Sequence, residues 1–221
     1  MLTDWWAALL DIIYPPRCPV CRRPVAVHGA WCPACLAPVL AGHELNLVGR
    51  RLAALASCRV VCDYAAGVKT LLHRLKFRGG ARAAVPLAWL LAARPDGLRL
   101  GGIQAVVPVP LHPGRLAERG YNQTELIFRR WAEQQGWPWC EALIRTRPTA
   151  PQWELPPAER RRNVRGAFAL ARPEAVRGKT ILLVDDIVTT GATINECAKV
   201  LRRGGAAKIH ALALAGGDYG R

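Results

Sequence analysis

The segment ILLVDDIVTTGAT, residues 181–193, contains the side chains best suited to chemistry on a sugar phosphate. Asp185 and Asp186 follow an apolar stretch typical of a buried strand, so both are expected at its carboxyl end, where open α/β sheets bind ligands. Adjacent carboxylates there can accept hydrogen bonds from the cis-diol of a ribose. They can also stabilise positive charge developing at the anomeric carbon, so we predict that this pair is catalytic.

The loop after the acidic pair is suited to a phosphate. It consists of Thr189, Thr190, Gly191, Ala192 and Thr193, and a helix is expected to begin within it. Hydroxyls and free backbone N–H groups converge at a helix N-terminus, where the partial positive charge favours an anion. An ordinary Thr-capped turn would use the same residue types, but the ordered combination favours a ribose 5-phosphate site. No Walker A motif is present, so the sequence gives no support to an ATPase.

A second group of polar residues follows the apolar stretch 103–109. Val109, Pro110 and Leu111 form a proline-stiffened loop that should lie at the same sheet edge, and Arg115 and Arg119 come next. Fixed backbone N–H groups and guanidinium groups suit a pyrophosphate, because arginine binds phosphate oxygens in a bidentate manner. The alternative is that the prolines only end a strand and the arginines face solvent.

Residues 145–168 form a long, proline-broken and strongly basic stretch. It could be a lid over the site, with Gln152, Arg160, Arg162 and Asn163 as polar contacts. It could equally be a solvated basic loop.

Four cysteines near the N-terminus have the spacing of a metal site. They form two C-x₂-C pairs, Cys18 with Cys21 and Cys32 with Cys35. Four thiolates in two such pairs can close a tetrahedral zinc site, and an all-cysteine set indicates a structural ion. Four reduced, buried thiols are the alternative. We interpret the remaining cysteines as structural and regard lone histidines as weak competitors for the metal; these residues are Cys58, Cys62, Cys140, Cys197, His28 and His43.

The overall composition describes a basic protein. Lys and Arg number 31 against 16 Asp and Glu, a formal charge of +15 that favours polyanionic partners, although a basic surface without a partner has the same composition. The N-terminal segment MLTDWWAALLDIIYPP has no basic leader, and the longest apolar run, 83–93, is too short to span a bilayer. We therefore expect a cytoplasmic location.

The site residues require an alternation of strands and helices to position them. Strand-like stretches lie at 60–64, 103–109, 180–184 and 208–214, and helix-like stretches at 67–77, 83–93, 124–135 and 192–203. This order predicts an α/β fold with a doubly wound, mainly parallel sheet. Residues 1–16 are predicted to form an amphipathic helix. We expect two domains, an N-terminal helix and zinc module over 1–60 and the α/β domain over 61–221.

Residues 181–193 resemble the signature of type I phosphoribosyltransferases, which bind phosphoribosyl pyrophosphate (PRPP) with Mg²⁺. In that family the acidic pair contacts the ribose hydroxyls and the following loop holds the 5-phosphate. With the paired cysteines, LKFRG at 75–79, RGYNQ at 119–123 and the stretch from Gln152 to Phe168, the chain is similar to the ComF family of competence proteins. This resemblance implies a zinc finger joined to a phosphoribosyltransferase fold. It also implies a role in uptake of single-stranded DNA during natural transformation, with a helicase-like partner.

Two functions therefore remain open. One is a Mg²⁺-dependent phosphoribosyltransferase acting on an unknown acceptor. The other is a protein that binds single-stranded DNA and a competence partner without catalysis, and the two kinds of binding are compatible. Trp137, Trp139 and Trp153 could stack on bases, or could pack in the core or a lid.

Overall fold

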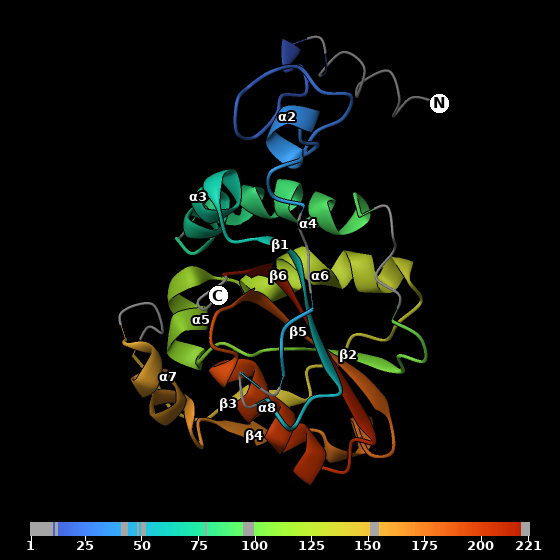
Figure 1. The fold of residues 1–221 in the computed structure, drawn as a ribbon, viewed down its shortest axis with the longest axis vertical. Coiled ribbons are helices and arrows are strands. Elements are labelled where there is room, and N and C mark those ends of the chain that lie inside the picture. Colours follow the sequence, from blue (N-terminus) through green and yellow to red (C-terminus); the bar gives the residue numbers. More distant parts are fainter. Residues whose placement is uncertain are drawn as a thin grey trace.

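The computed structural model describes residues 11, 13–40, 44–47, 49, 52–77, 79–94, 100–150 and 155–217 (Figure 1). Its centre is a four-stranded sheet with the order β1-β6-β5-β2, in which every neighbouring pair is parallel. The strands are β1 (Ser57–Asp63), β2 (Ala105–Pro108), β5 (Thr180–Val188) and β6 (Lys208–Gly216). The two inner strands, β5 and β6, are the longest and are mostly buried, as expected for strands covered on both faces.

Helices cover both faces of this sheet, which confirms the predicted doubly wound α/β fold (Figure 1). Because strand side chains alternate between faces, Leu182 and Val184 pack with one apolar cluster while Ile181 and Leu183 pack with the other. The first cluster is covered by α3 (Ala66–Leu75), α4 (Ala84–Ala92) and α6 (Gln123–Gln134). The second is covered by α8 (Ala192–Arg203) and the antiparallel pair β3 (Leu143–Arg145) and β4 (Phe168–Leu170).

The expected strands and the four helices of the α/β domain form within a few residues of their predicted bounds, with one consequential difference. The strand predicted at 180–184 continues to Val188, because β6 pairs with it along its whole length. The shorter elements escaped prediction, since each has too few residues for an apolar period. They are α2 (Pro33–Leu36), η1 (Gly80–Ala83), α5 (Pro113–Arg119), α7 (Pro157–Val164), η2 (Pro173–Ala175), β3 and β4.

The cysteine-rich segment lies above α3 and α4, on the side away from the sheet (Figure 1). Trp31 is buried there, and its indole N–H donates to the carbonyl of Pro86 in α4 at 2.9 Å. Gly67, at the start of α3, has room for no side chain, since a Cβ would lie 2.2 Å from Cγ2 of Val20. The segment therefore packs tightly on the α/β domain, while the division at residue 60 stays a prediction.

Most of the helix predicted over 1–16 lies outside the described residues, as do Gln152, Trp153 and His43. Among the helices that the structure describes, none combines the length and apolar character needed to cross a bilayer.

Candidate ribose-phosphate site and metal centre

The acidic pair lies near the carboxyl end of β5 and within the strand, which continues past it to Val188. The ladder between β2 and β5 ends at Val184, whereas β5 continues to Val188 alongside β6. Asp185 and Asp186 therefore sit where β5 has lost its partner on one side but keeps it on the other. Both are buried, with 8% and 6% of their surface exposed.

Asp185 is held close to the backbone on the α8 face of the sheet. Its Oδ1 accepts a hydrogen bond from the N–H of Asp186 at 2.9 Å. Burial raises the pKa of Asp185 well above its ordinary value, and the neighbouring charge of Asp186 raises it further. The Asp186 N–H and the positive charge of Lys76 act in the opposite direction. The protonation state of Asp185 therefore depends on the charged groups around it.

Asp186 faces the other side of the sheet, toward a lysine that the sequence analysis did not place in the site. Nζ of Lys76 lies 3.4 Å from Oδ2 of Asp186 in an ion pair. Apart from this ion pair, Oδ2 is buried and accepts no hydrogen bond from any residue that the structure describes. A buried carboxylate oxygen without a donor is costly, so a ligand hydroxyl would find a favourable partner there.

The threonine-rich loop leads directly into α8. Gly191 has φ +75° and precedes the first turn of α8, a conformation that favours glycine. The N–H of Ala192 turns back toward Oγ1 of Thr190, at 3.4 Å. Thr189, Thr190 and Thr193 are half-buried, so their hydroxyls lie at the edge of the fold.

The basic stretch after Arg145 meets this loop. It contains the helix α7, and Nη1 of Arg160 donates to Oγ1 of Thr189 at 3.1 Å. Asn163 also holds the stretch together, because its side-chain amide donates to the carbonyl of Ala150 at 2.9 Å. Of the polar contacts that a lid would make, the structure shows the one from Arg160 to Thr189, whereas Asn163 contacts its own stretch. Arg162 is exposed on α7.

The loop with Val109, Pro110 and Leu111 lies beside the acidic pair. The N–H of Val109 donates to the carbonyl of Val184 at 2.9 Å, just before Asp185. The side-chain amide of Asn122 donates to the carbonyl of Val109 at 3.2 Å, and its Oδ1 accepts from the N–H of Thr124 as the cap of α6. The predicted pyrophosphate loop is therefore fixed from both sides.

Three arginines share the electrostatic environment of this loop. Burial lowers the pKa of Arg119, and the opposite charge of Asp186 counteracts this while the like charge of Arg115 adds to it. Burial also lowers the pKa of Arg145, again with Arg115 adding to it. The guanidinium of Arg145 lies over the ring of Phe168, 5.4 Å from its centroid. Arg145 was not predicted as a site residue, and neither was Lys76.

The tryptophans offered as base-stacking candidates pack instead against the core. Trp137 and Trp139 are half-buried against the cluster under α3, α4 and α6, and the ring of Trp137 lies edge-on to Trp131 at 5.3 Å.

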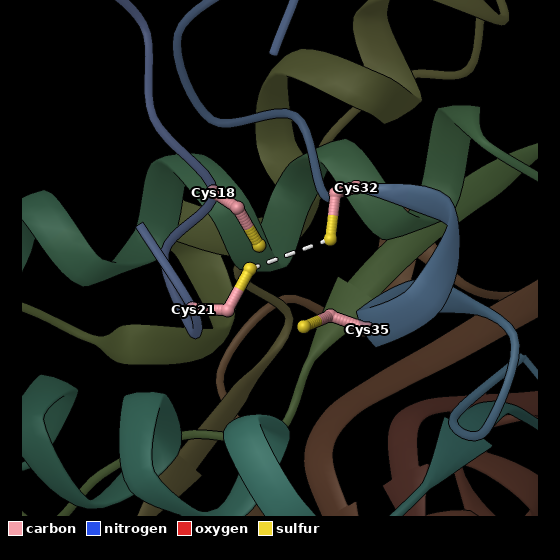
Figure 2. A group of neighbouring side chains, drawn as sticks. All are labelled: Cys18, Cys21, Cys32 and Cys35. Atoms are coloured by element: carbon pink, nitrogen blue, oxygen red, sulfur yellow. Dashed lines mark hydrogen bonds between the residues drawn. The ribbon is translucent and has the colours of Figure 1, made fainter. Parts of the chain in front are cut away.

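The four N-terminal cysteines converge on one point, as Figure 2 shows. Their sulfur atoms all lie within 4.8 Å of one another, and Sγ of Cys21 is 3.5 Å from Sγ of Cys32. The segment from Cys18 to Cys21 is closed by a tight turn, and α2 begins directly after Cys32 and contains Cys35. This geometry fits a tetrahedral ion with four thiolate ligands.

The thiols of this cluster differ in acidity. Burial opposes ionisation of Cys18, but hydrogen bonds from the backbone of Cys32, Cys21 and Val20 outweigh it and lower the pKa of Cys18 to about 6. Burial and the neighbouring thiols raise the pKa of Cys35 to about 12. Four thiols so close compete for ionisation, and a dication would relieve that competition.

His28 and the four cysteines interpreted as structural are not part of the cluster. Exposed His28 contacts Asp11 at 2.9 Å. Cys58 and Cys62 are fully buried in β1, and the thiol of Cys62 donates to the carbonyl of Leu214 at 3.1 Å. Cys197 is buried in α8 and Cys140 is half-buried.

Two known protein families match this chain, one within the α/β domain and one over the cysteine-rich segment. The phosphoribosyl transferase domain family matches residues 146–220, and the double zinc ribbon domain family matches residues 9–60. The chain thus joins a zinc ribbon to a domain with the phosphoribosyltransferase fold.

Relatives identify the family more closely. The DNA utilization protein YhgH of Escherichia coli K12 is 38% identical over 204 residues, which cover 87% of this chain and 86% of that protein. Competence protein F of Haemophilus influenzae is 29% identical over 208 residues, covering 90% and 84%. Competence protein ComFC of Bacillus subtilis is 29% identical over 198 residues, covering 89% and 76%. The chain belongs to the ComF family.

Among solved structures, glutamine PRPP amidotransferase from B. subtilis, in complex with ADP and GMP, is 20% identical with a TM-score of 0.34. The match covers 66% of this chain and only 26% of that one, and is too weak to add to the assignment.

Proposed function

We propose that this protein binds PRPP, or a similar ribose phosphate, at the acidic edge of its sheet and acts in DNA uptake for natural transformation. The observation that carries the ligand class is the buried Oδ2 of Asp186, which has the Lys76 ion pair but accepts no hydrogen bond from the described residues, and lies near the end of a parallel strand. The names of its relatives, a DNA utilization protein and two competence proteins, support the biological role.

Each part of the ligand has a matching set of groups. The 5-phosphate would occupy the loop of residues 189–193, at the N-terminus of α8. The ribose hydroxyls would donate to Asp185 and Asp186, and the pyrophosphate would meet Arg115, Arg119 and the backbone of Val109 to Leu111. Mg²⁺ would enter with the pyrophosphate oxygens and lower their charge.

Phosphoribosyl transfer would break the anomeric C–O bond, release pyrophosphate and join the ribose to an acceptor nucleophile. The chain's contribution would be orientation and preorganised charge, because the carboxylates of the acidic pair face the ribose as positive charge develops. No described residue beside the acidic pair stands out as a general base for an acceptor. Binding is therefore the core of this proposal, and transfer is its extension.

Calorimetric titration with Mg²⁺ and PRPP tests the binding step. The wild type should bind, and the Asp185→Asn/Asp186→Asn variant should lose at least tenfold in affinity, because neutral amides accept ribose hydroxyls more weakly. Asp63→Asn is the matched control, since Asp63 ends β1 at the far side of the same sheet edge. No binding by the wild type, or equal binding by the double variant, would refute the proposal.

A second function, binding of single-stranded DNA, is favoured by α7. This helix carries Arg160, Arg161 and Arg162 in succession, and Arg161 and Arg162 are exposed. The Arg160 contact to Thr189 brings the helix against the phosphate loop, so a polyanion on α7 would run past the ribose-phosphate site.

Oligonucleotide binding at several salt concentrations tests this second function. Arg161→Gln/Arg162→Gln should weaken binding and flatten its salt dependence, because fewer counterions are released. Arg129→Gln/Arg130→Gln is the control, an exposed arginine pair on α6. Equal effects of the two pairs would mean that α7 has no special role.

A further inference from the structure

Lys76 is a cation beside the acidic pair, and it lies outside both segments proposed to bind the ligand, residues 109–119 and 181–193. It follows the last residue of α3, and Nζ reaches 3.4 Å from Oδ2 of Asp186, more than a hundred residues away in the chain. The Lys76 side chain is about one-third exposed, whereas the Asp186 side chain is buried. Lys76 therefore approaches Asp186 from the solvent side, where a ligand would enter.

The backbone around Lys76 is held by one side chain. The hydroxyl of Tyr121 lies 2.8 Å from the carbonyl of Leu75 and 3.0 Å from that of Phe77, the residues on either side of Lys76. A hydroxyl shared between these two carbonyls fixes the turn at the end of α3 and limits where the lysine can point.

Tyr121 also connects this turn to the predicted pyrophosphate loop. It directly precedes Asn122, whose amide is bound to the carbonyl of Val109. The segments LKFRG and RGYNQ thus meet through Tyr121, and Lys76 of the first segment reaches the acidic pair. Together these contacts define the position of the Lys76 ammonium group.

The charges around Asp186 explain why the position of the Lys76 ammonium group matters for ligand binding. Asp185 lies next to it on β5, so two carboxylates would otherwise face an anionic ligand together. Lys76 and, more distantly, Arg119 provide the positive charge on this side of the sheet. An anionic sugar phosphate can approach a carboxylate pair only where its charge is compensated.

We propose that Lys76 is a positioning residue of the ribose-phosphate site: held by Tyr121, it orients and neutralises Asp186 so that the carboxylate can accept a ribose hydroxyl beside bound phosphates. This inference rests on the proposed binding of a ribose phosphate. It gives Lys76 no contact with the ligand, which separates its role from that of Arg115 and Arg119.

A double-mutant cycle in PRPP and ribose 5-phosphate affinity tests the proposal. Lys76→Met should weaken both ligands by roughly tenfold or more, since a buried carboxylate is left without its cation. Lys76→Arg should restore most of the affinity, and Tyr121→Phe should cost roughly threefold to tenfold by freeing the turn. Lys69→Met is the control, because it removes the same charge from an exposed position on α3.

The Asp186→Asn background distinguishes positioning from direct contact. There, Lys76→Met should change ribose 5-phosphate affinity by less than about twofold, because no carboxylate remains to be neutralised. An undiminished loss in that background, or a Lys76→Met variant that binds like Lys69→Met, would overturn the proposal. If the wild type binds neither ligand, the proposed function itself fails.

Melting temperatures without ligand give a second, independent cycle. Lys76→Met should lower the melting temperature, and adding Asp186→Asn should recover it, because the unpaired buried charge is gone. Additive effects of the two substitutions would show that the ion pair does not form.

Discussion

Gly191→Ala gives a quantitative test of the phosphate loop. Gly191 has φ +75°, and a Cβ at this position would lie 2.7 and 2.8 Å from the two terminal methyl carbons of Leu52. Leu52 is 1% exposed and belongs to the core under α8, so it has little room to move. The substitution should therefore carry two separate costs, one from the backbone and one from packing.

The two costs can be estimated separately. A left-handed conformation costs an alanine about 1–2 kcal/mol. Overpacking against a buried leucine costs about 1–3 kcal/mol more. A total near 3 kcal/mol should lower the melting temperature by roughly 6–12 °C in a chain of this size.

Gly178→Ala isolates the backbone cost. Gly178 has φ +70°, and a Cβ there would meet nothing within 4 Å. Urea unfolding of both variants should give a difference of about 1–3 kcal/mol, the packing cost at Leu52. Titration with ribose 5-phosphate should show a loss for Gly191→Ala alone, because of these two glycines only Gly191 lies in the proposed phosphate loop. Equal stability of the two variants, with unchanged ligand affinity, would refute the account of the loop.

Three further predictions concern the metal, the docking of its module and the acidic pair. Metal analysis should find one zinc per chain, and chelation or Cys18→Ser should remove it and lower the melting temperature; a zinc-free chain of full stability would contradict the cluster's role. Gly67→Ala should cost about 1–3 kcal/mol in urea unfolding, because its Cβ would overlap Val20, and a neutral effect would mean that the module is loosely seated. Burial raises the pKa of Asp185 in the folded state, so wild-type stability should fall as pH rises from the unfolded pKa through the folded one. Asp185→Asn cannot ionise and so does not lose this stability. The melting temperature of the variant should therefore rise relative to that of the wild type as pH increases. A difference that stays constant from pH 5 to 8 would contradict this account.

The sequence by itself determined the features that depend on neighbouring residues. The apolar runs predicted the parallel strands, and the residues at 181–193 predicted the succession of strand, turn and helix that the structure shows there, while their binding of a phosphate stays a prediction. The two C-x₂-C pairs predicted the cysteine cluster that the fold assembles. These signals are local, because strand period, helix onset and ligand spacing are all written within a few residues.

Only the tertiary structure decided which distant residues join the site. β5 extends past the acidic pair because β6 continues to pair with it, a contact that no pattern within β5 encodes. Lys76 reaches Asp186 from the end of α3, and Arg160 reaches Thr189 from a helix with almost no apolar period. Such contacts depend on how helices pack over a sheet, and the charged side chains involved carry no periodic signal. The ribose-phosphate motif and the arginines at 115 and 119 could thus be found in the sequence, whereas Lys76 and Arg145 were placed beside the proposed site only by the fold.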